Sequence, residues 1–352
     1  MQPTIIPAFL KWNYRVAGIL TAFTLVATTT VQADEGGVSF WLPGLFGSLA
    51  AVPQQPGWAL TVINYYDSVG ASGSVAAARE ITIGRFNPTV NVNLNVNLNA
   101  KIDAGLINPS YVFATPVLGG QLTLGMMGLV EYNNTDLNGT LTLSSGGLAV
   151  AKQGALSETT TGFGDLYPQA IMRWNSGVDN WMIYGTGDIP VGDYSATNLA
   201  NIGIGHGAAD AGGGYTYFNP QTGHEFSAVT GFTYNLINPA TGYQNGVDWH
   251  LDWGASQFLS KQLLVGAVGY FYEQVSPDNG CAPQLCPFES GVIGVGPQIG
   301  YIFPVGSLQG YVNVKAYWEF DNHDRPAGWN GWITFSLSPS APISAKAALI
   351  TK

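Results

Sequence analysis

The stretch Leu308–Phe320 alternates strictly between apolar and polar residues. Val312 and Val314 belong to its apolar parity, and Asn313 and Lys315 to its polar parity. A period of two is that of a β-strand, whose successive side chains point to opposite faces. An amphipathic helix is excluded, because at 100° per residue the apolar groups would spread around the whole axis. The two faces therefore have different surroundings: core and water in a soluble sandwich, or lipid and a polar lumen in a transmembrane barrel.

Composition favours the barrel. Charged residues make up 10% of the 352 residues, against about 25% in ordinary soluble domains. Beyond the amino terminus, no apolar run approaches the ~20 residues that a spanning helix needs, so the chain would have to cross a membrane by strands. The formal net charge of −10 argues against nucleic acid as a partner and fits an exported, anionic protein.

The first residues, 1–33, are typical of a secretory signal. Lys11 and Arg15 form a basic region, Val16–Ala27 is an apolar stretch, and Val31 and Ala33 are the small residues of a cleavage site. This order predicts export and removal of the segment.

Two cysteines, Cys281 and Cys286, lie five positions apart in Cys-Ala-Pro-Gln-Leu-Cys. No histidine or further cysteine stands nearby to complete a zinc site. In an exported chain we therefore expect a local disulfide that holds the tip of a loop. Its ring is too short to stabilise the whole fold much.

Residues 34–57 are punctuated by glycine and proline and yet are largely apolar. Such a segment is a poor strand and a poor helix. An apolar segment without regular structure must be covered, so we expect a plug in the lumen or a periplasmic arm packed under the barrel. A flexible lead-in to the first strand is the remaining interpretation.

From Trp58 to Leu337, alternating runs are separated by connections that are short and long in turn. Val117–Gly120 and Pro304–Ser307 are examples of tight turns, and Asn133–Thr161 is expected to be a long Gly/Ser/Thr loop. Short turns at one end and long loops at the other are typical of outer-membrane barrels.

The predicted strand number depends on residues 79–103. Counting Arg79–Phe86 as a strand, and separating Thr89–Lys101 from Leu106–Pro116, gives 14 strands; treating Arg79–Asp103 as loop or plug gives 12. We prefer 14, because Thr89–Lys101 alternates too regularly to discard. The predicted fold is an all-β, antiparallel transmembrane β-barrel over residues 58–337, followed by a tail of residues 338–352.

Several short motifs follow one another along the chain: Trp-Leu-Pro-Gly from Trp41, Gly-Phe-Gly-Asp-Leu from Gly162, Leu-Asp-Trp-Gly-Ala-Ser-Gln-Phe from Leu251, Gly-Val-Gly-Pro-Gln-Ile-Gly-Tyr from Gly294 and Tyr-Trp-Glu-Phe-Asp-Asn-His-Asp-Arg-Pro from Tyr317. In this order they resemble the family named for a meta-pathway of phenol degradation, often called simply "transporter". The resemblance spans nearly the whole mature chain. It implies a Gram-negative outer-membrane barrel that passes small aromatic or other hydrophobic molecules, and it transfers no catalytic residue.

If the apolar parity faces lipid, the polar parity supplies candidate lumen residues. Charges in a narrow lumen must pair, because an unpaired ion away from water costs several kcal/mol. The first interpretation is structural: Lys315 and Arg173 pair with acidic neighbours. The second is a constriction that selects solutes by charge and aromatic contact. The candidates are Asp165, Tyr167, Gln169, Arg173, Asp248, His250, Asp252, Asn313, Lys315, Tyr317 and Glu319.

His250 and Ser256 share the polar parity, but six strand residues separate them by roughly 20 Å, which is too far for a nucleophile and its base. No catalytic group, metal site or cofactor is predicted.

Gly162–Pro168 interrupts a strand with two glycines and a proline, which indicates either a structural bulge or a lateral opening in the wall.

The predicted function is passive uptake of small hydrophobic or aromatic molecules across the bacterial outer membrane. The expected partners are outer-membrane lipid, lipopolysaccharide and the solute. The alternative is a structural or surface-interaction barrel with a closed lumen, whose function lies in its loops. An open path through the lumen would discriminate between the two.

Overall fold

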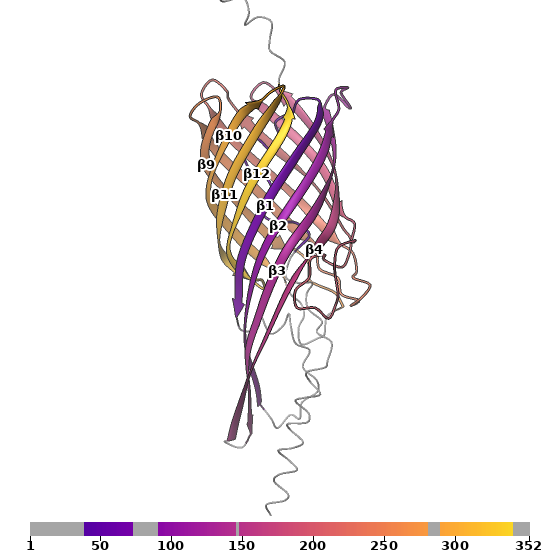
Figure 1. The fold of residues 1–352 in the computed structure, drawn as a ribbon, viewed down its shortest axis with the longest axis vertical. Coiled ribbons are helices and arrows are strands. Elements are labelled where there is room, and N and C mark those ends of the chain that lie inside the picture. The colour runs from indigo at the N-terminus through magenta and orange to yellow at the C-terminus, as the bar shows by residue number, and fades with distance from the viewer. Residues whose placement is uncertain (1–38, 73–90, 146–147, 281–288, 341–352) are drawn as a thin grey trace, which may run out of the picture.

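The computed structural model describes residues 39–72, 91–145, 148–280 and 289–340 of the chain. Within these residues twelve antiparallel strands form one closed barrel, in which each strand pairs with its neighbours in sequence and β1 pairs with β12 (Figure 1). No helix in the described part is long and apolar enough to cross a membrane. The strands are β1 (Gly57–Ser72), β2 (Asn91–Val112), β3 (Gln121–Ser145), β4 (Leu148–Ser176), β5 (Asp179–Asp188), β6 (Ala208–Phe218), β7 (His224–Asn235), β8 (Asp248–Phe258), β9 (Leu263–Gln274), β10 (Gly291–Val305), β11 (Leu308–His323) and β12 (Ala327–Pro339).

The expected all-β antiparallel barrel is confirmed, but the preferred count of 14 strands is wrong. The described part of the first run, residues 91–101, and residues 106–112 of the second belong to one continuous strand, β2, which pairs with β3 on both sides of Asp103. The other predicted strand, Arg79–Phe86, lies outside the described residues, as do the signal segment, the two cysteines and residues 341–352. The alternative count of 12 agrees with the structure, but residues 91–103, which that alternative treated as loop or plug, belong to β2.

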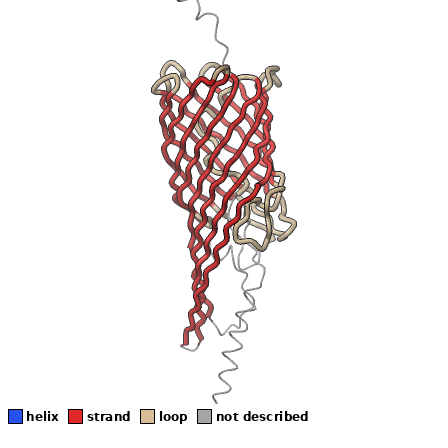
Figure 2. The backbone as a smooth tube through the Cα atoms, in the orientation of Figure 1, coloured by secondary structure: helices blue, strands red, loops and turns tan. Residues whose placement is uncertain are grey.

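The two ends of the barrel differ in their connections (Figure 2). At one end the strands are joined by short turns, such as residues 177–178 between β4 and β5 and 306–307 between β10 and β11. At the other end lie longer loops, including residues 189–207 between β5 and β6. Since outer-membrane barrels have short periplasmic turns and longer extracellular loops, we assign the long-loop end to the cell exterior.

β11 shows how the two faces of the wall differ. Val314, Trp318 and Phe320 are 43%, 60% and 48% exposed, whereas Lys315 and Tyr317 on the other parity are 5% and 0% exposed. The apolar side chains therefore point outward and the polar ones point into the barrel. A closed wall with an apolar outer face satisfies its backbone hydrogen bonds internally and meets lipid outside, as an outer-membrane protein requires.

Residues 133–161 correct a second expectation. Instead of a long loop, residues 133–145 continue β3 and residues 148–161 belong to β4, and the two strands pair along this length, Asn134 with Thr159 and Leu137 with Leu156. β2 pairs along the other side of β3, so that three strands project past the rest of the wall (Figure 1). We call this projection, formed by residues 91–101, 134–145 and 148–159, the β2–β4 ribbon.

Candidate functional site

Residues 39–56 lie inside the barrel and are called the luminal segment here. Their backbone and side chains bond to groups on β3, β4, β6, β7, β8, β10 and β11. Because these strands stand around a closed ring, a segment that bonds to all of them must lie within it. The segment accounts for part of the buried apolar cluster of the lumen, which includes Trp41, Tyr270, Tyr317 and Trp332.

A turn at residues 42–46 is held between an ammonium group and a carboxylate. Asp252 accepts hydrogen bonds from the amides of Gly44 (2.9 Å) and Phe46 (3.0 Å). Lys315 Nζ donates to the carbonyl oxygens of Gly44 (2.6 Å), Leu45 (3.2 Å) and Phe46 (3.4 Å). Both side chains are buried, and the peptide groups of the turn give both charges hydrogen-bond partners.

The sequence Leu42-Pro43-Gly44-Leu45 explains this turn. The Leu45 amide donates to the Leu42 carbonyl at 3.1 Å, and Gly44 has φ +89°. Proline and then a residue with positive φ are the preferences of a type II turn. A Cβ on Gly44 would lie 2.9 Å from the Tyr317 ring, so both backbone and space require glycine here.

The rest of the luminal segment follows the wall toward the short-turn end. The Leu49 amide donates to Glu225 (2.9 Å) and the Ala51 amide to Thr216 (3.0 Å). Arg173 Nε donates to the Ala50 carbonyl at 3.3 Å. Two charged side chains, Glu225 on β7 and Arg173 on β4, thus form hydrogen bonds with the backbone of this segment.

Trp41 covers three hydrogen-bonded polar side chains, His250, Asp210 and Tyr184, near the long-loop end of the lumen. Its indole stacks on the His250 imidazole, with ring centroids 3.6 Å apart and planes 13° apart. His250 Nε2 lies 3.0 Å from Asp210 Oδ2 and 3.3 Å from the Tyr184 hydroxyl. Ser256 is occupied elsewhere, since its hydroxyl bonds to Ser48 at 2.8 Å.

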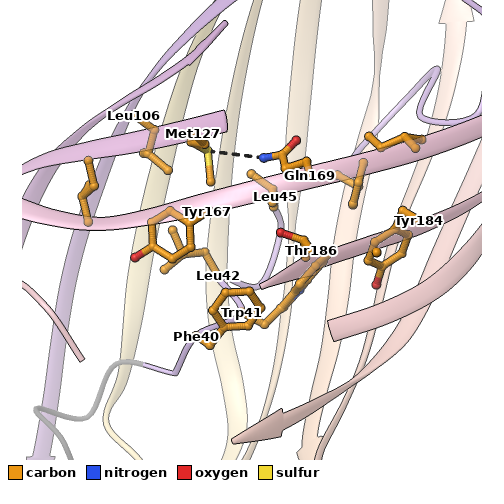
Figure 3. A pocket seen from close by; sticks show the side chains of 14 residues that line it. Phe40, Trp41, Leu42, Leu45, Leu106, Met127, Tyr167, Gln169, Tyr184 and Thr186 are labelled. Atoms are coloured by element: carbon orange, nitrogen blue, oxygen red, sulfur yellow. Dashed lines mark hydrogen bonds between the residues drawn. The ribbon is translucent and has the colours of Figure 1, made fainter. Parts of the chain in front are cut away.

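An apolar cavity of about 50 Å³ lies between the luminal segment and the wall formed by β2 to β5 (Figure 3). Gln169 Nε2 points across it toward Met127 Sδ, 4.0 Å away. Here the inward face of the wall is itself apolar, unlike the usual polar lumen of a barrel. Its lining residues are Phe40, Trp41, Leu42, Leu45, Phe46, Leu106, Met127, Leu129, Tyr167, Gln169, Ile171, Tyr184, Gly185 and Thr186.

The wall beside this cavity is irregular. The β3–β4 register shifts between Gly128 and Val130, and regular β4–β5 pairing begins only at Gln169, with one isolated bridge at Leu166. Toward the cell exterior, the loop of residues 189–207 takes the place of a paired strand. Asp165 holds this loop by accepting from the amides of Gly192 (2.7 Å) and Ile204 (2.9 Å).

Each candidate lumen residue from the sequence lies on the inward parity of its strand, but their surroundings differ. Tyr167 and Gln169 line the cavity, and Asp165 anchors the loop beside it. Asp248 accepts from Asn235 at 2.9 Å, and Asn313 donates to the Ile299 carbonyl at 3.2 Å. Arg173, His250, Asp252, Lys315 and Tyr317 contact the luminal segment, the last through a 3.3 Å bond to the Gly44 carbonyl.

The ionic pairing that the sequence suggested is replaced by bonds to backbone and hydroxyl groups. Glu319 accepts from the Tyr270 hydroxyl (2.7 Å) and the Gly328 amide (2.8 Å), and Arg173 Nη1 donates to Thr123 (3.3 Å). For Asp252, Lys315 and Arg173 the physical reason is that the luminal segment brings peptide groups into the lumen. Glu319 is satisfied by groups of the wall itself.

Sequence reasoning missed the wall residues of the cavity and most of the anchors. Leu106, Met127 and Leu129 face inward although they are apolar, so polarity could not assign them. Glu225 and Gln298 stand on inward parities of β7 and β10, and extending the parity rule to those strands would have identified them. No pattern in residues 39–46 indicated which side chain meets which strand.

Comparison with known proteins identifies the family of this chain and solved structures with a similar fold. The profile of the family described as "Putative MetA-pathway of phenol degradation" matches residues 80–335. The chain belongs to this family. No curated protein sequence matches it. Among solved structures, an outer-membrane channel from Pseudomonas putida F1 is similar with a TM-score of 0.57 and 12% identity, over 82% of this chain and 97% of that one. A FadL homologue from Pseudomonas aeruginosa has a TM-score of 0.37 and 12% identity, over 88% and 98% of the two chains. This member of the family therefore has the fold of an outer-membrane channel and is located in the outer membrane.

Proposed function

We propose that this protein is a channel for passive uptake of small hydrophobic or aromatic molecules, with the luminal segment as its plug. The observation that carries the proposal is the aromatic and aliphatic cavity between that segment and β2 to β5. Pockets for small molecules are mostly apolar, with a few polar groups that fix orientation, and Gln169, Thr186 and the Tyr184 hydroxyl are such groups here. Membership of the family supports the same solute class.

The volume of the cavity makes movement of the luminal segment part of the mechanism. An engineered protein cavity that binds benzene measures about 150 Å³, three times the volume of this one. A ring-sized solute therefore fits only if residues 40–46 move away from the wall. Such a step needs no cofactor or energy source, because entry is driven by the solute gradient.

The irregular wall beside the cavity gives a hydrophobic solute a route that avoids the aqueous side of the lumen. From the cavity, the path between β4 and the loop of residues 189–207 is closed by few backbone bonds, one of them from the Asp193 amide to the Phe163 carbonyl at 3.0 Å. We propose that Gly162–Pro168 is a lateral exit toward lipid. Leu166, which is 37% exposed, lies within this stretch and forms the isolated bridge to Ile189.

Uptake by cells tests the proposed function. Porin-deficient Gram-negative cells that express the full chain are compared with cells carrying an empty vector, and the initial uptake rate of radiolabelled toluene and benzyl alcohol is measured. The proposal predicts faster uptake of both with the protein present. Equal rates, with the folded barrel demonstrated in the outer membrane, would show that it is not a channel for these solutes.

Two observations favour a second candidate, a closed barrel that acts through its external surface. The luminal segment bonds to seven strands, and the β2–β4 ribbon presents a large surface beyond the wall. Conductance of the purified protein in planar bilayers distinguishes the two. A closed barrel gives no current at any voltage, whereas a plugged channel gives intermittent current when the segment moves.

A further inference from the structure

The contacts of the turn at residues 42–46 suggest what kind of solute the lumen prefers. Asp252 and Lys315 project from β8 and β11 and are 1% and 5% exposed. What lies between them is not another side chain but peptide groups, whose N–H donates to the carboxylate and whose C=O accepts from the ammonium. The turn therefore fills a small polar site with neutral groups that donate and accept at once.

This polar site is surrounded by aromatic rings. Lys315 Nζ lies 5.0 Å from the centroid of the Trp332 ring and 5.9 Å from that of Tyr317. Tyr317 in turn packs against Tyr270, with centroids 4.9 Å apart. A ring-bearing molecule that replaced the turn would find flat apolar surfaces next to the two charged groups. Residues 40–46 also form one side of the apolar cavity, so their departure joins the cavity to this site.

We propose that Asp252 and Lys315 form a specificity site for aromatic solutes that carry a neutral donor–acceptor group, such as a carboxamide or a hydroxyl. The inference rests on the proposed function and goes further by naming the group that is recognised. Such a group supplies a donor for Asp252 and an acceptor for Lys315, the two roles that Gly44 N–H and C=O have in the turn. A carboxylate accepts from Lys315 but offers no donor to Asp252 and is repelled by its charge. A bare hydrocarbon leaves both buried charges without hydrogen bonds, which is costly in a water-poor site.

Four solutes with the same ring test the site: benzamide, benzyl alcohol, benzoate and toluene. Their uptake is measured in porin-deficient cells expressing the full chain, with the rate of empty-vector cells subtracted. The wild-type protein should take up benzamide and benzyl alcohol faster than benzoate and toluene. The loss of one charge-assisted hydrogen bond corresponds to about a tenfold change in preference.

Two variants test whether Asp252 and Lys315 cause this preference among the four solutes. Lys315→Met should reduce the ratio of benzamide to toluene uptake by about tenfold. Asp252→Asn, which keeps the shape of the side chain and removes its charge, should raise benzoate uptake relative to benzamide. Lys261→Met, on the exposed turn between β8 and β9, is the matched control and should change neither ratio. Because ratios are compared, a general loosening of the luminal segment does not imitate the effect.

The outcomes separate this inference from the proposed function. If toluene enters and the solute ratios are the same in all variants, the specificity site is wrong and the channel stands. If no solute enters above the vector rate, the channel itself is wrong. Should Lys315→Met fail to assemble, the nearly isosteric Asp252→Asn still decides, because unchanged benzoate selectivity in that variant contradicts the site.

Discussion

Gly254 on β8 allows the luminal segment to lie directly against the wall. A Cβ at this position would be 2.8 Å from the Ser48 amide nitrogen and 3.1 Å from the Gly47 carbonyl carbon. These are backbone atoms that cannot rotate away, so Gly254→Val should displace the segment and raise the conductance of the protein in planar bilayers. Gly154→Val, on the β2–β4 ribbon, is the matched control, since a Cβ on Gly154 has no neighbour within 4 Å. Equal conductance of the two variants would contradict the close contact between Gly254 and the backbone of residues 47–48.

At the scale of single residues, parity along a strand predicts where a side chain points but not what it meets. Asp252 and Lys315 could be assigned to the lumen from the alternation of their strands. Their partners could not, because Gly44 is 208 positions from the first and 271 from the second. The expected ion pairs rested on the assumption that charged lumen side chains can bond only to each other. Asp252 and Lys315 instead form hydrogen bonds with peptide groups of residues 44–46.

As an element, the luminal segment can be locked in place. Ser48 Oγ and Ser256 Oγ are 2.8 Å apart, close enough to suggest that cysteines at both positions can form a disulfide. If the segment is the plug, oxidised Ser48→Cys/Ser256→Cys should lose uptake of toluene, and a reductant should restore it. Each single cysteine variant should behave as wild type under both conditions. Full uptake through the oxidised double variant would show that solutes pass without movement of residue 48.

The loop of residues 189–207 is the element that completes the wall beside β4. Asp165 holds it with two backbone amides, and charge-assisted bonds are about twice as strong as neutral ones. Asp165→Asn should therefore release the loop, with faster cleavage by an external protease within residues 189–207 and faster toluene uptake through the proposed lateral exit. Glu273→Gln, at a side chain that is 43% exposed, serves as the control. Unchanged protease sensitivity would mean that Asp165 does not restrain the loop.

The sequence predicted most elements from alternation alone, and its two errors share one cause. The abundance of glycine, serine and threonine in Asn133–Thr161 predicts a loop, whereas residues 133–145 and 148–161 are strand. Thr89–Lys101 and Leu106–Pro116 are predicted as two strands, whereas residues 91–112 form the single strand β2. In the described part of both segments the outward face carries polar side chains, such as Lys101, Asp103 and Asn138, which are exposed. A rule based on lipid contact therefore ends a strand at the membrane surface although its hydrogen bonds continue.

Across the whole molecule, this change of polarity marks the outer boundary of the membrane. On β3 the outward side chains Met126 and Val130 are 40% and 42% exposed and apolar, whereas Asn138, farther along the same face, is exposed and polar. The change falls at the row in which Asp103, Tyr132 and Thr161 pair across three strands. Tyrosine at this level is typical of the interfacial belt of a barrel. The β2–β4 ribbon then stands beyond the lipid.

The same substitution on either side of this boundary tests the placement. Val314 lies near the middle of β11 and points outward, so Val314→Arg puts a charge into lipid, which costs about 2–4 kcal/mol near the midplane. It should lower both the amount of folded barrel in the outer membrane and the urea concentration at which the barrel unfolds. Asn138→Arg, outward on the ribbon, should change neither, and Val314→Leu controls for side-chain size. The folded fraction is measured from the shift in electrophoretic mobility between unheated and heated samples. If Val314→Arg assembles as well as Asn138→Arg, the outward face of β11 does not meet lipid and the assignment of the two faces is wrong.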